Sequence, residues 1–157
     1  MIYIVTVSGG EYDGHWTHSI AATRDHVKAQ KLVETLEAEA KLLKFHAPAI
    51  SERFLGWTTA NPMPPRPSFM QVPTNKERKA DPTLEAKYKL AVTNNAAQNG
   101  NWTQAYTAWS EKAQAVIDGL RKEYRISKPL PYYHFISVHG PHLDEETYGI
   151  EEVPELE

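Results

Sequence analysis

The start of the chain has the hydrophobic pattern of two β-strands joined by a turn. Residues 2–7 form an unbroken apolar run, IYIVTV, which is rich in β-branched side chains and too short for a helix. Both faces of this run are apolar or nearly so, which predicts a central strand. The Gly9-Gly10 pair and Asp13-Gly14 indicate turns. We therefore predict a strand at Ile2–Val7 and a return strand at His15–Ala22.

The next stretch has a helical pattern. Apolar residues recur at positions 29, 33, 36, 40 and 43, which places them on one face of a helix, and charged residues occupy the opposite face. Thr23 is a suitable N-cap, and Asp25 adds a negative charge to the first turn. These signals predict a helix from about Arg24 to about Lys44 that packs on one face of the sheet. Because Pro48 limits any helix before it, residues 45–60 remain ambiguous.

The middle of the chain is rich in proline. Five prolines between Asn61 and Pro73 exclude a regular helix or a central strand there. We predict an extended loop, partly polyproline II, that continues through a basic cluster at Lys76–Lys79. The loop is either a plain connection or a proline-rich ligand for an aromatic groove.

Two helices are predicted after this loop, over residues 81–125. Asp81-Pro82 combines an N-cap residue with a proline at the first helical position. The first helix should run to about Gln98, and Asn99-Gly100 predicts a turn. The second helix carries an apolar stripe from Trp102 to Leu120 and should end near Tyr124. Together they predict an antiparallel helical hairpin, inserted between the second and third strands.

Two strands are predicted at the end of the chain. The prolines at 129 and 131 end the helix, and Tyr132–His139 reads as a strand of aromatic and β-branched residues. Gly140-Pro141 predicts a turn, and Thr147–Val153 predicts a short edge strand. The expected fold class is therefore α+β, with a small, mostly antiparallel sheet of three or four strands, a helix on one face and an inserted α-helical hairpin. We expect residues 1–157 to form one domain, divided into 1–44, 61–80, 81–125 and 132–157.

The amino-acid composition indicates the cellular compartment in which the protein is expected. The 157 residues include no cysteine, which excludes disulfides, a thiol nucleophile and thiolate metal sites, and is consistent with a reducing compartment. The pattern of a signal peptide is absent, as is any apolar window long enough to span a bilayer. We therefore expect a cytoplasmic protein with no membrane partner.

The net charge of −3 is unevenly distributed. Residues 143–157 contain seven acidic residues and no Lys or Arg. This acidic end is either a solvated terminus or a strip that engages a basic surface of a partner or mimics the charge of nucleic acid.

The seven histidines carry the catalytic or metal-binding potential of the sequence. His139 and His142 flank a Gly-Pro turn and could chelate zinc or manganese, with Asp144 or Glu146 as a carboxylate ligand. The competing interpretation is that these are loop histidines that bind no metal.

A second use of the histidines is acid–base chemistry. His15-Trp16-Thr17 fits one H-x-[ST] motif of the two-histidine phosphoesterases, which pair two imidazoles on neighbouring strands. In this alternative His15 and His134 form the acid–base pair and Thr17 contacts phosphate, although the hydroxyl after His134 comes one residue late. Phosphate-binding glycine loops and basic DNA-binding helices are absent. We expect no cofactor and no nucleic-acid partner.

The two ends of the chain resemble small accessory proteins encoded by bacteriophages and mobile elements. Such proteins often begin with a strand like Tyr3–Thr6, a turn like Gly10–Asp13 and a helix like Thr23–Val33. Many close on an acidic strand like Tyr148–Val153. The resemblance contains no catalytic motif and implies an origin more than a function.

The sequence therefore favours a non-enzymatic, phage-type protein that binds and modulates a host bacterial protein, in host takeover or anti-defence. The alternatives are a phosphodiester- or nucleotide-acting enzyme that uses the histidines, and a small structural or oligomerising protein, for which a homo-oligomer is the expected assembly. The expected partner-binding residues belong to the proline-rich loop, the basic cluster and the acidic end: Arg66, Phe69, Met70, Lys76, Arg78, Lys79, Asp144, Glu145 and Glu146.

Overall fold

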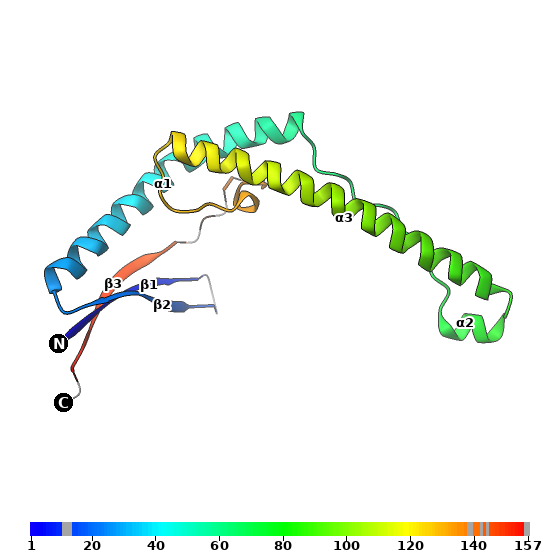
Figure 1. The fold of residues 1–157 in the computed structure, drawn as a ribbon, viewed down its shortest axis with the longest axis horizontal. Coiled ribbons are helices and arrows are strands. Elements are labelled where there is room, and N and C mark those ends of the chain that lie inside the picture. The colour runs from blue at the N-terminus through cyan, green and yellow to red at the C-terminus, as the bar shows by residue number, and fades with distance from the viewer. Residues whose placement is uncertain (11–13, 138–139, 142, 144, 156–157) are drawn as a thin grey trace. The chain divides into compact units, whose positions relative to one another are not determined.

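A computed structural model describes residues 1–10, 14–137, 140–141, 143 and 145–155 of the chain. The elements follow one another in the order β1, β2, α1, α2, α3, η1 and β3 (Figure 1). They belong to two compact units. The first unit comprises residues 1–57 and 116–157, and the second comprises residues 58–115.

The first unit contains an antiparallel sheet with the strand order β2-β1-β3. β1 (Ile2–Gly9) is central, while β2 (Trp16–Thr23) and β3 (Thr147–Val153) lie at the edges (Figure 1). This confirms the predicted α+β class, the central position of the first strand and the edge position of the last. β1 continues two residues beyond the predicted Val7, and β2 begins one residue after the predicted His15.

The pairing between β1 and β2 contains a β-bulge. Val5 pairs with Ala21, but the next residue, Thr6, pairs with Ser19. Ile20 is therefore the extra residue on β2, and a bulge of this kind re-aims its side chain. Ile20 is 44% exposed although it is a large apolar residue.

Helix α1 (His26–Ala60) begins after Asp25. The Asp25 carboxylate accepts hydrogen bonds from the backbone N–H groups of Val27 and Lys28, at 3.0 and 3.2 Å. Asp25 is thus the N-cap, and the prediction that Thr23 takes this position is wrong. The Thr23 hydroxyl instead accepts a hydrogen bond from the N–H of Asp25, at 3.1 Å.

The same helix continues well beyond the predicted end at Lys44, because Pro48 does not stop it. A proline inside a helix costs about 3 kcal/mol, since it removes one hydrogen bond and crowds the preceding turn. The buried residues nevertheless keep helical spacing on both sides of Pro48. They are Leu43, Ala47, Ile50, Ser51 and Phe54. Burial of this continuous face offsets the unfavourable proline.

Helix α3 (Leu84–Glu123) is one uninterrupted helix, so the predicted helical hairpin is wrong. It begins two residues after the predicted first helical position, Pro82, although the Asp81 carboxylate accepts a hydrogen bond from the N–H of Thr83 at 3.0 Å, as an N-cap residue does. The expected turn at Asn99-Gly100 is solvent-exposed helix. A glycine inside a helix costs only about 1 kcal/mol, which the long helical runs on both sides outweigh.

The predicted strand at Tyr132–His139 is wrong over its described part. Tyr132–Phe135 forms the 3-10 helix η1, in which the N–H of His134 donates to the carbonyl of Pro131 at 3.2 Å. Pro129 and Pro131 lack the N–H groups that a strand would pair, and their fixed φ favours a turn. Phe135 is fully buried and anchors η1 in the core. Residues 138–139 lie outside the described residues.

The core of the first unit draws side chains from several elements. The fully buried large residues are Val5, Ile50, Phe54, Ile117 and Phe135. At the surface, the Arg53 guanidinium of α1 pairs with Glu123 at the end of α3, at 2.6 Å. In the part of the chain that is described, no helix has the length and apolar character needed to cross a bilayer.

Candidate functional site

The second unit holds an extended, proline-rich stretch against α3. We call residues 61–74 the proline segment; from residue 62 onward it has no regular secondary structure, as predicted. The indole N–H of Trp109 donates to the carbonyl of Asn61 at 2.8 Å, and that of Trp102 donates to the carbonyl of Pro64 at 3.1 Å. Aromatic side chains of α3 therefore hold the backbone of a proline-rich chain, as aromatic grooves hold polyproline ligands.

These aromatic side chains form a continuous row on one face of α3. The rings of Trp102 and Tyr106 stack with their centroids 5.2 Å apart, and those of Tyr106 and Trp109 with theirs 6.2 Å apart. The Arg66 guanidinium lies over the Trp102 ring, 5.2 Å from its centroid. Arg66, which was predicted to bind a partner, is thus positioned by a cation–π contact within the unit.

The far end of the proline segment is fixed by an asparagine clamp. The N–H of Met70 donates to Asn95 Oδ1 at 2.8 Å, and Asn95 Nδ2 donates back to the carbonyl of Met70 at 2.9 Å. Asn94 Nδ2 donates to the sulfur of Met70 at 3.4 Å. Met70 was predicted from the sequence to bind a partner, whereas neither asparagine was predicted, although Asn95, Trp102 and Trp109 recur every seven residues.

Apolar side chains of the proline segment remain in solvent. Phe69 is 49% exposed, and Met63, Met70 and Val72 are also exposed. Exposed apolar side chains that gather in one place are typical of interaction surfaces, whereas scattered ones are common. The proline segment is therefore an ordered backbone that presents apolar groups to the outside.

The basic cluster follows the proline segment, but it forms a helix rather than the predicted loop. Helix α2 (Asn75–Ala80) begins with a capping box between Thr74 and Glu77. The Thr74 hydroxyl accepts from the N–H of Glu77 at 3.3 Å, and the N–H of Thr74 donates to Glu77 Oε2 at 2.7 Å. The hydrogen bonds from Thr74 hold the pKa of Glu77 below its ordinary value.

The cations of this cluster have different surroundings. Arg78 pairs with Glu85 at 3.1 Å and lies over the Tyr88 ring, 3.7 Å from its centroid, so it anchors α2 to α3. Lys76 and Lys79 are exposed, and within the described residues neither has an ion-pair partner. Of the three predicted partner-binding cations on α2, Lys76 and Lys79 are therefore available and Arg78 is engaged.

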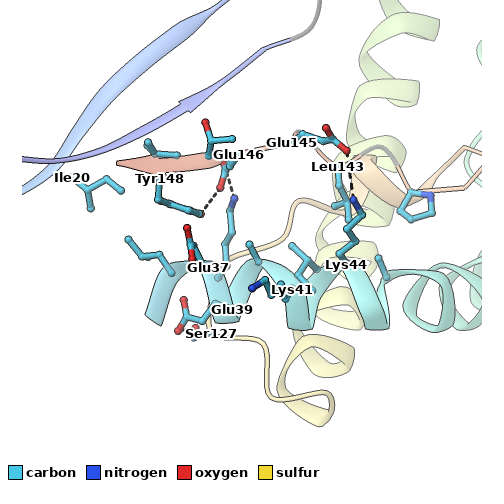
Figure 2. A pocket seen from close by; sticks show the side chains of 18 of the residues that line it. Ile20, Glu37, Glu39, Lys41, Lys44, Ser127, Leu143, Glu145, Glu146 and Tyr148 are labelled. Atoms are coloured by element: carbon cyan, nitrogen blue, oxygen red, sulfur yellow. Dashed lines mark hydrogen bonds and ion pairs between the residues drawn. The ribbon is translucent and has the colours of Figure 1, made fainter. Parts of the chain in front are cut away.

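Of the three predicted acids of the acidic end, Glu145 and Glu146 are described, and each has a lysine partner (Figure 2). Glu146 accepts a hydrogen bond from the Tyr148 hydroxyl at 2.7 Å, and its other oxygen lies 2.7 Å from Lys128 Nζ. Glu145 is largely exposed and lies 3.5 Å from Lys44 Nζ. The third predicted acid, Asp144, lies outside the described residues.

The surroundings of Glu146 shift two pKa values. Partial burial raises the pKa of Glu146, but the hydrogen bonds from Lys128 and Tyr148 outweigh it, and the pKa lies below its ordinary value. Burial and the hydrogen bond to Glu146 both raise the pKa of Tyr148. At neutral pH Glu146 is therefore ionised and Tyr148 protonated, so this pair can accept and donate hydrogen bonds but lacks a group poised for proton transfer.

Glu146 and Tyr148 line a cavity of about 1140 Å³ in the first unit (Figure 2). Leu36 and Leu43 of α1 and Ile20 at the β-bulge contribute apolar lining. The carboxylate of Glu39 also lines the cavity and accepts a hydrogen bond from the Ser127 hydroxyl at 2.6 Å. The carboxylates of Glu39 and Glu146 are thus satisfied by groups of the protein itself.

The histidines of the enzymatic alternative are not arranged on neighbouring strands. His15 is exposed just before β2, and the Thr17 hydroxyl on β2 shares a hydrogen bond of 2.9 Å with Ser8. His134 lies in η1, where its ring packs edge-on against Tyr133. The predicted strand that would carry the second motif is therefore missing from the described chain.

The histidines of the metal alternative, His139 and His142, lie outside the described residues. Among the residues that are described, no three His, Asp or Glu side chains are grouped closely enough to hold a metal ion. Comparison with known proteins adds no function to this geometry, because no family model, curated protein or solved structure matches the chain.

Proposed function

We propose that this chain is a non-enzymatic binding protein, and that it engages a partner protein through the proline segment and α2. The observation that carries the proposal is the exposure of Phe69 and Met63 on a backbone that hydrogen bonds from side chains of α3 hold in place. Large apolar side chains on an ordered, exposed strip are suited to be anchors that enter a pocket of the partner.

The hydrogen bonds to α3 favour binding because they order the segment in advance. A flexible segment loses about 1–2 kcal/mol of backbone conformational entropy per residue when a partner orders it. In this chain the indoles of Trp102 and Trp109 and the amide of Asn95 already hold the segment in the free protein. Binding through Phe69 therefore requires little further ordering of the backbone.

The charges around the segment indicate the chemistry of the partner. Arg66, Lys76 and Lys79 are exposed cations on or next to the proline segment. Cations at the rim of an interface accelerate association with an acidic surface and select against a basic one. The resemblance of the chain ends to phage accessory proteins makes a host bacterial protein the expected partner, bound and modulated in the host cytoplasm.

A matched pair of phenylalanine variants tests the proposal. The tagged chain is used to capture proteins from bacterial lysate, and a stoichiometric partner is purified and titrated calorimetrically against Phe69→Ala and Phe45→Ala. Phe45 is the control, because it lies on α1 in the first unit and is 79% exposed. We expect Phe69→Ala to weaken binding about tenfold or more, as for an interface anchor, and Phe45→Ala to leave it unchanged. Equal affinities of both variants and the unmodified chain would refute the assignment to the proline segment.

A further inference from the structure

The cavity in the first unit has the size and the lining of a site for a small organic molecule. Its volume of about 1140 Å³ slightly exceeds the roughly 300–1,000 Å³ of typical ligand pockets. Its apolar lining comes from β1, β2, α1 and the chain before β3, with Val7, Ile20, Leu36, Leu43 and Leu143 as the larger side chains (Figure 2). A mostly apolar hollow with a few polar groups at its wall is the usual form of such a site.

The charges on the wall of the cavity are compensated unequally. Among the described residues, four carboxylates and three lysines line it. Two of these lysines form ion pairs, since Lys128 lies 2.7 Å from Glu146 and Lys44 lies 3.5 Å from Glu145. Two carboxylates and one lysine of the wall therefore remain to be matched.

Glu39 is the carboxylate that is left without a cation. Glu37 and Lys41 are exposed and lie one turn apart on α1, with the acid first, a spacing at which opposite charges stabilise each other. Glu39 is half-buried, and its one hydrogen bond comes from the neutral hydroxyl of Ser127. In the part of the chain that the structure describes, no cation lies within ion-pair distance of it. The cavity thus carries one uncompensated negative charge.

Two further observations give this wall the character of a hydrogen-bond acceptor. Pro48 lines the cavity and lacks an N–H group, so the carbonyl of Lys44, four residues earlier in α1, has no helical donor. The charge of Glu39 also reaches the opposite wall. Burial, the hydrogen bond to Glu146 and, to a smaller extent, the charge of Glu39 raise the pKa of Tyr148. The wall therefore favours a positively charged donor.

We propose that this cavity binds an organic ammonium ion, with its charged nitrogen at Glu39 and its apolar body against Leu36, Leu43 and Ile20. An ammonium group brings one positive charge and three N–H donors, which match the unpaired carboxylate. The apolar body gains burial against the leucines. The site lies in the first unit and does not depend on the proline segment, so the two proposals succeed or fail separately.

The experiment compares three probes that share one apolar cage and differ in charge: adamantylammonium, adamantanol and adamantanecarboxylate. Each is titrated at neutral pH into the isotope-labelled full chain, and binding is followed by the NMR shifts of the backbone amides. We expect the ammonium ion to bind about tenfold or more tightly than the alcohol, as for a hydrogen bond to a charged group. The carboxylate should bind most weakly, and the shifts should centre on Leu36, Leu43 and Tyr148.

Variants at the wall test the role of Glu39. Glu39→Gln removes the charge but keeps the size of the side chain and an acceptor for Ser127, so the preference for the ammonium ion over the alcohol should disappear. Glu34→Gln is the matched control, because Glu34 is exposed on the same helix and does not line the cavity. Ala40→Phe fills the cavity from α1 and should abolish the binding of all three probes.

Several results would overturn the proposal. One is the absence of binding by the ammonium ion at millimolar concentration, and another is an equal or greater affinity for the carboxylate. A preference for the ammonium ion that survives in folded Glu39→Gln, or that is lost in Glu34→Gln, would also exclude Glu39 as its partner. Shifts confined to residues outside the cavity would place the probe elsewhere. If Glu39→Gln does not fold by far-UV circular dichroism, the three probes and Ala40→Phe decide the question.

Discussion

The two units of this chain are stabilised by different kinds of interaction. In the first unit, large apolar side chains from separate elements are fully buried, with Phe54 and Phe135 among the largest. In the second unit, side chains of α3 donate hydrogen bonds to backbone carbonyls of an extended segment, with Trp102, Trp109 and Asn95 as donors.

Because of this difference, the side chains that stabilise the first unit act in another way than those that position the proline segment in the second. Apolar burial is non-directional and contributes in proportion to the area removed from water. Hydrogen bonds to a backbone are directional, so they can fix one side of a segment and leave its other side exposed. Changes in the first unit should therefore lower the stability of that unit, while changes in the second should alter local order and partner binding.

The largest effect is expected from a core truncation in the first unit. Phe135→Ala should lower the free energy of unfolding by about 3–5 kcal/mol, because it removes a fully buried ring and leaves a cavity. Urea unfolding followed by circular dichroism measures this loss. Tyr133→Ala, in the same 3-10 helix but 62% exposed, should change stability by about 0.5 kcal/mol or less. Equal losses in the two variants would contradict the placement of Phe135 in the core.

A smaller effect is expected at the polar wall of the cavity. Glu146→Gln removes an ionised acceptor of two hydrogen bonds and should cost about 1–2 kcal/mol at neutral pH. Since the pKa of Glu146 is lowered from its ordinary 4.5 in the folded protein, its contribution is complete above pH 4.5 and is lost as the pH falls through the folded pKa. The difference from the unmodified chain should therefore shrink in acid.

Glu145→Gln is the control for this pH dependence. Glu145 is largely exposed, and its contact with Lys44 is 3.5 Å long, so its removal should change little at any pH. Urea unfolding at several pH values compares the two variants. A gap between Glu146→Gln and the unmodified chain that widens in acid would have the wrong sign for an ionised, hydrogen-bonded carboxylate.

The parts of the fold that the sequence predicted are those with a strong local signal. The apolar run of β1 is short and unbroken and ends at a pair of glycines, and the bounds predicted for the last strand, Thr147–Val153, match the structure. The apolar stripe of α3 was also predicted, and Trp109, Ala113 and Leu120 are buried. Each of these patterns depends only on residues that are close together in the sequence, which is why the elements they predicted agree with the structure.

The errors arose where a local breaker was opposed by tertiary packing. Pro48 and Asn99-Gly100 each disfavour a helix by only about 1–3 kcal/mol, and α1 and α3 continue through both. The opposite error occurred at Tyr132, where β-forming residues adopt a 3-10 helix after two prolines. At these positions the choice between helix and another structure depends on packing against residues that are far away in the sequence.

The same error hid part of the candidate site. The predicted break at Asn99-Gly100 assigned Asn95 and Trp102 to different helices, so their seven-residue spacing carried no meaning. Once α3 is continuous, Asn95, Trp102 and Trp109 share one face, and all three contact the proline segment. The residues of the proline segment could be named from the sequence, but the side chains that hold it could not.

A third test addresses the asparagine clamp on this face. Asn95→Ala removes both hydrogen bonds to the backbone of Met70, and amide exchange of Met70 should accelerate about tenfold, corresponding to roughly 1.4 kcal/mol of local stability. Asn99→Ala, one turn along the same helix and exposed, makes the same change in helix propensity. Hydrogen exchange measured by NMR should show no acceleration in that control. An equal response of both variants would mean that the helix, rather than the clamp, determines the order of the segment.

The smallest effect on stability is expected at the residue with the largest proposed effect on binding. Phe69 is already half in solvent, so Phe69→Ala should change the free energy of unfolding by only about 0.5 kcal/mol. Its affinity for the captured partner should fall, because an anchor side chain gains its burial only in the complex. Thermal unfolding and calorimetric titration of the same sample measure the two quantities together. If Phe69→Ala instead destabilised the chain as much as Phe135→Ala, Phe69 would belong to the packing of the second unit, and the contrast between a stabilising unit and a presenting one would not hold.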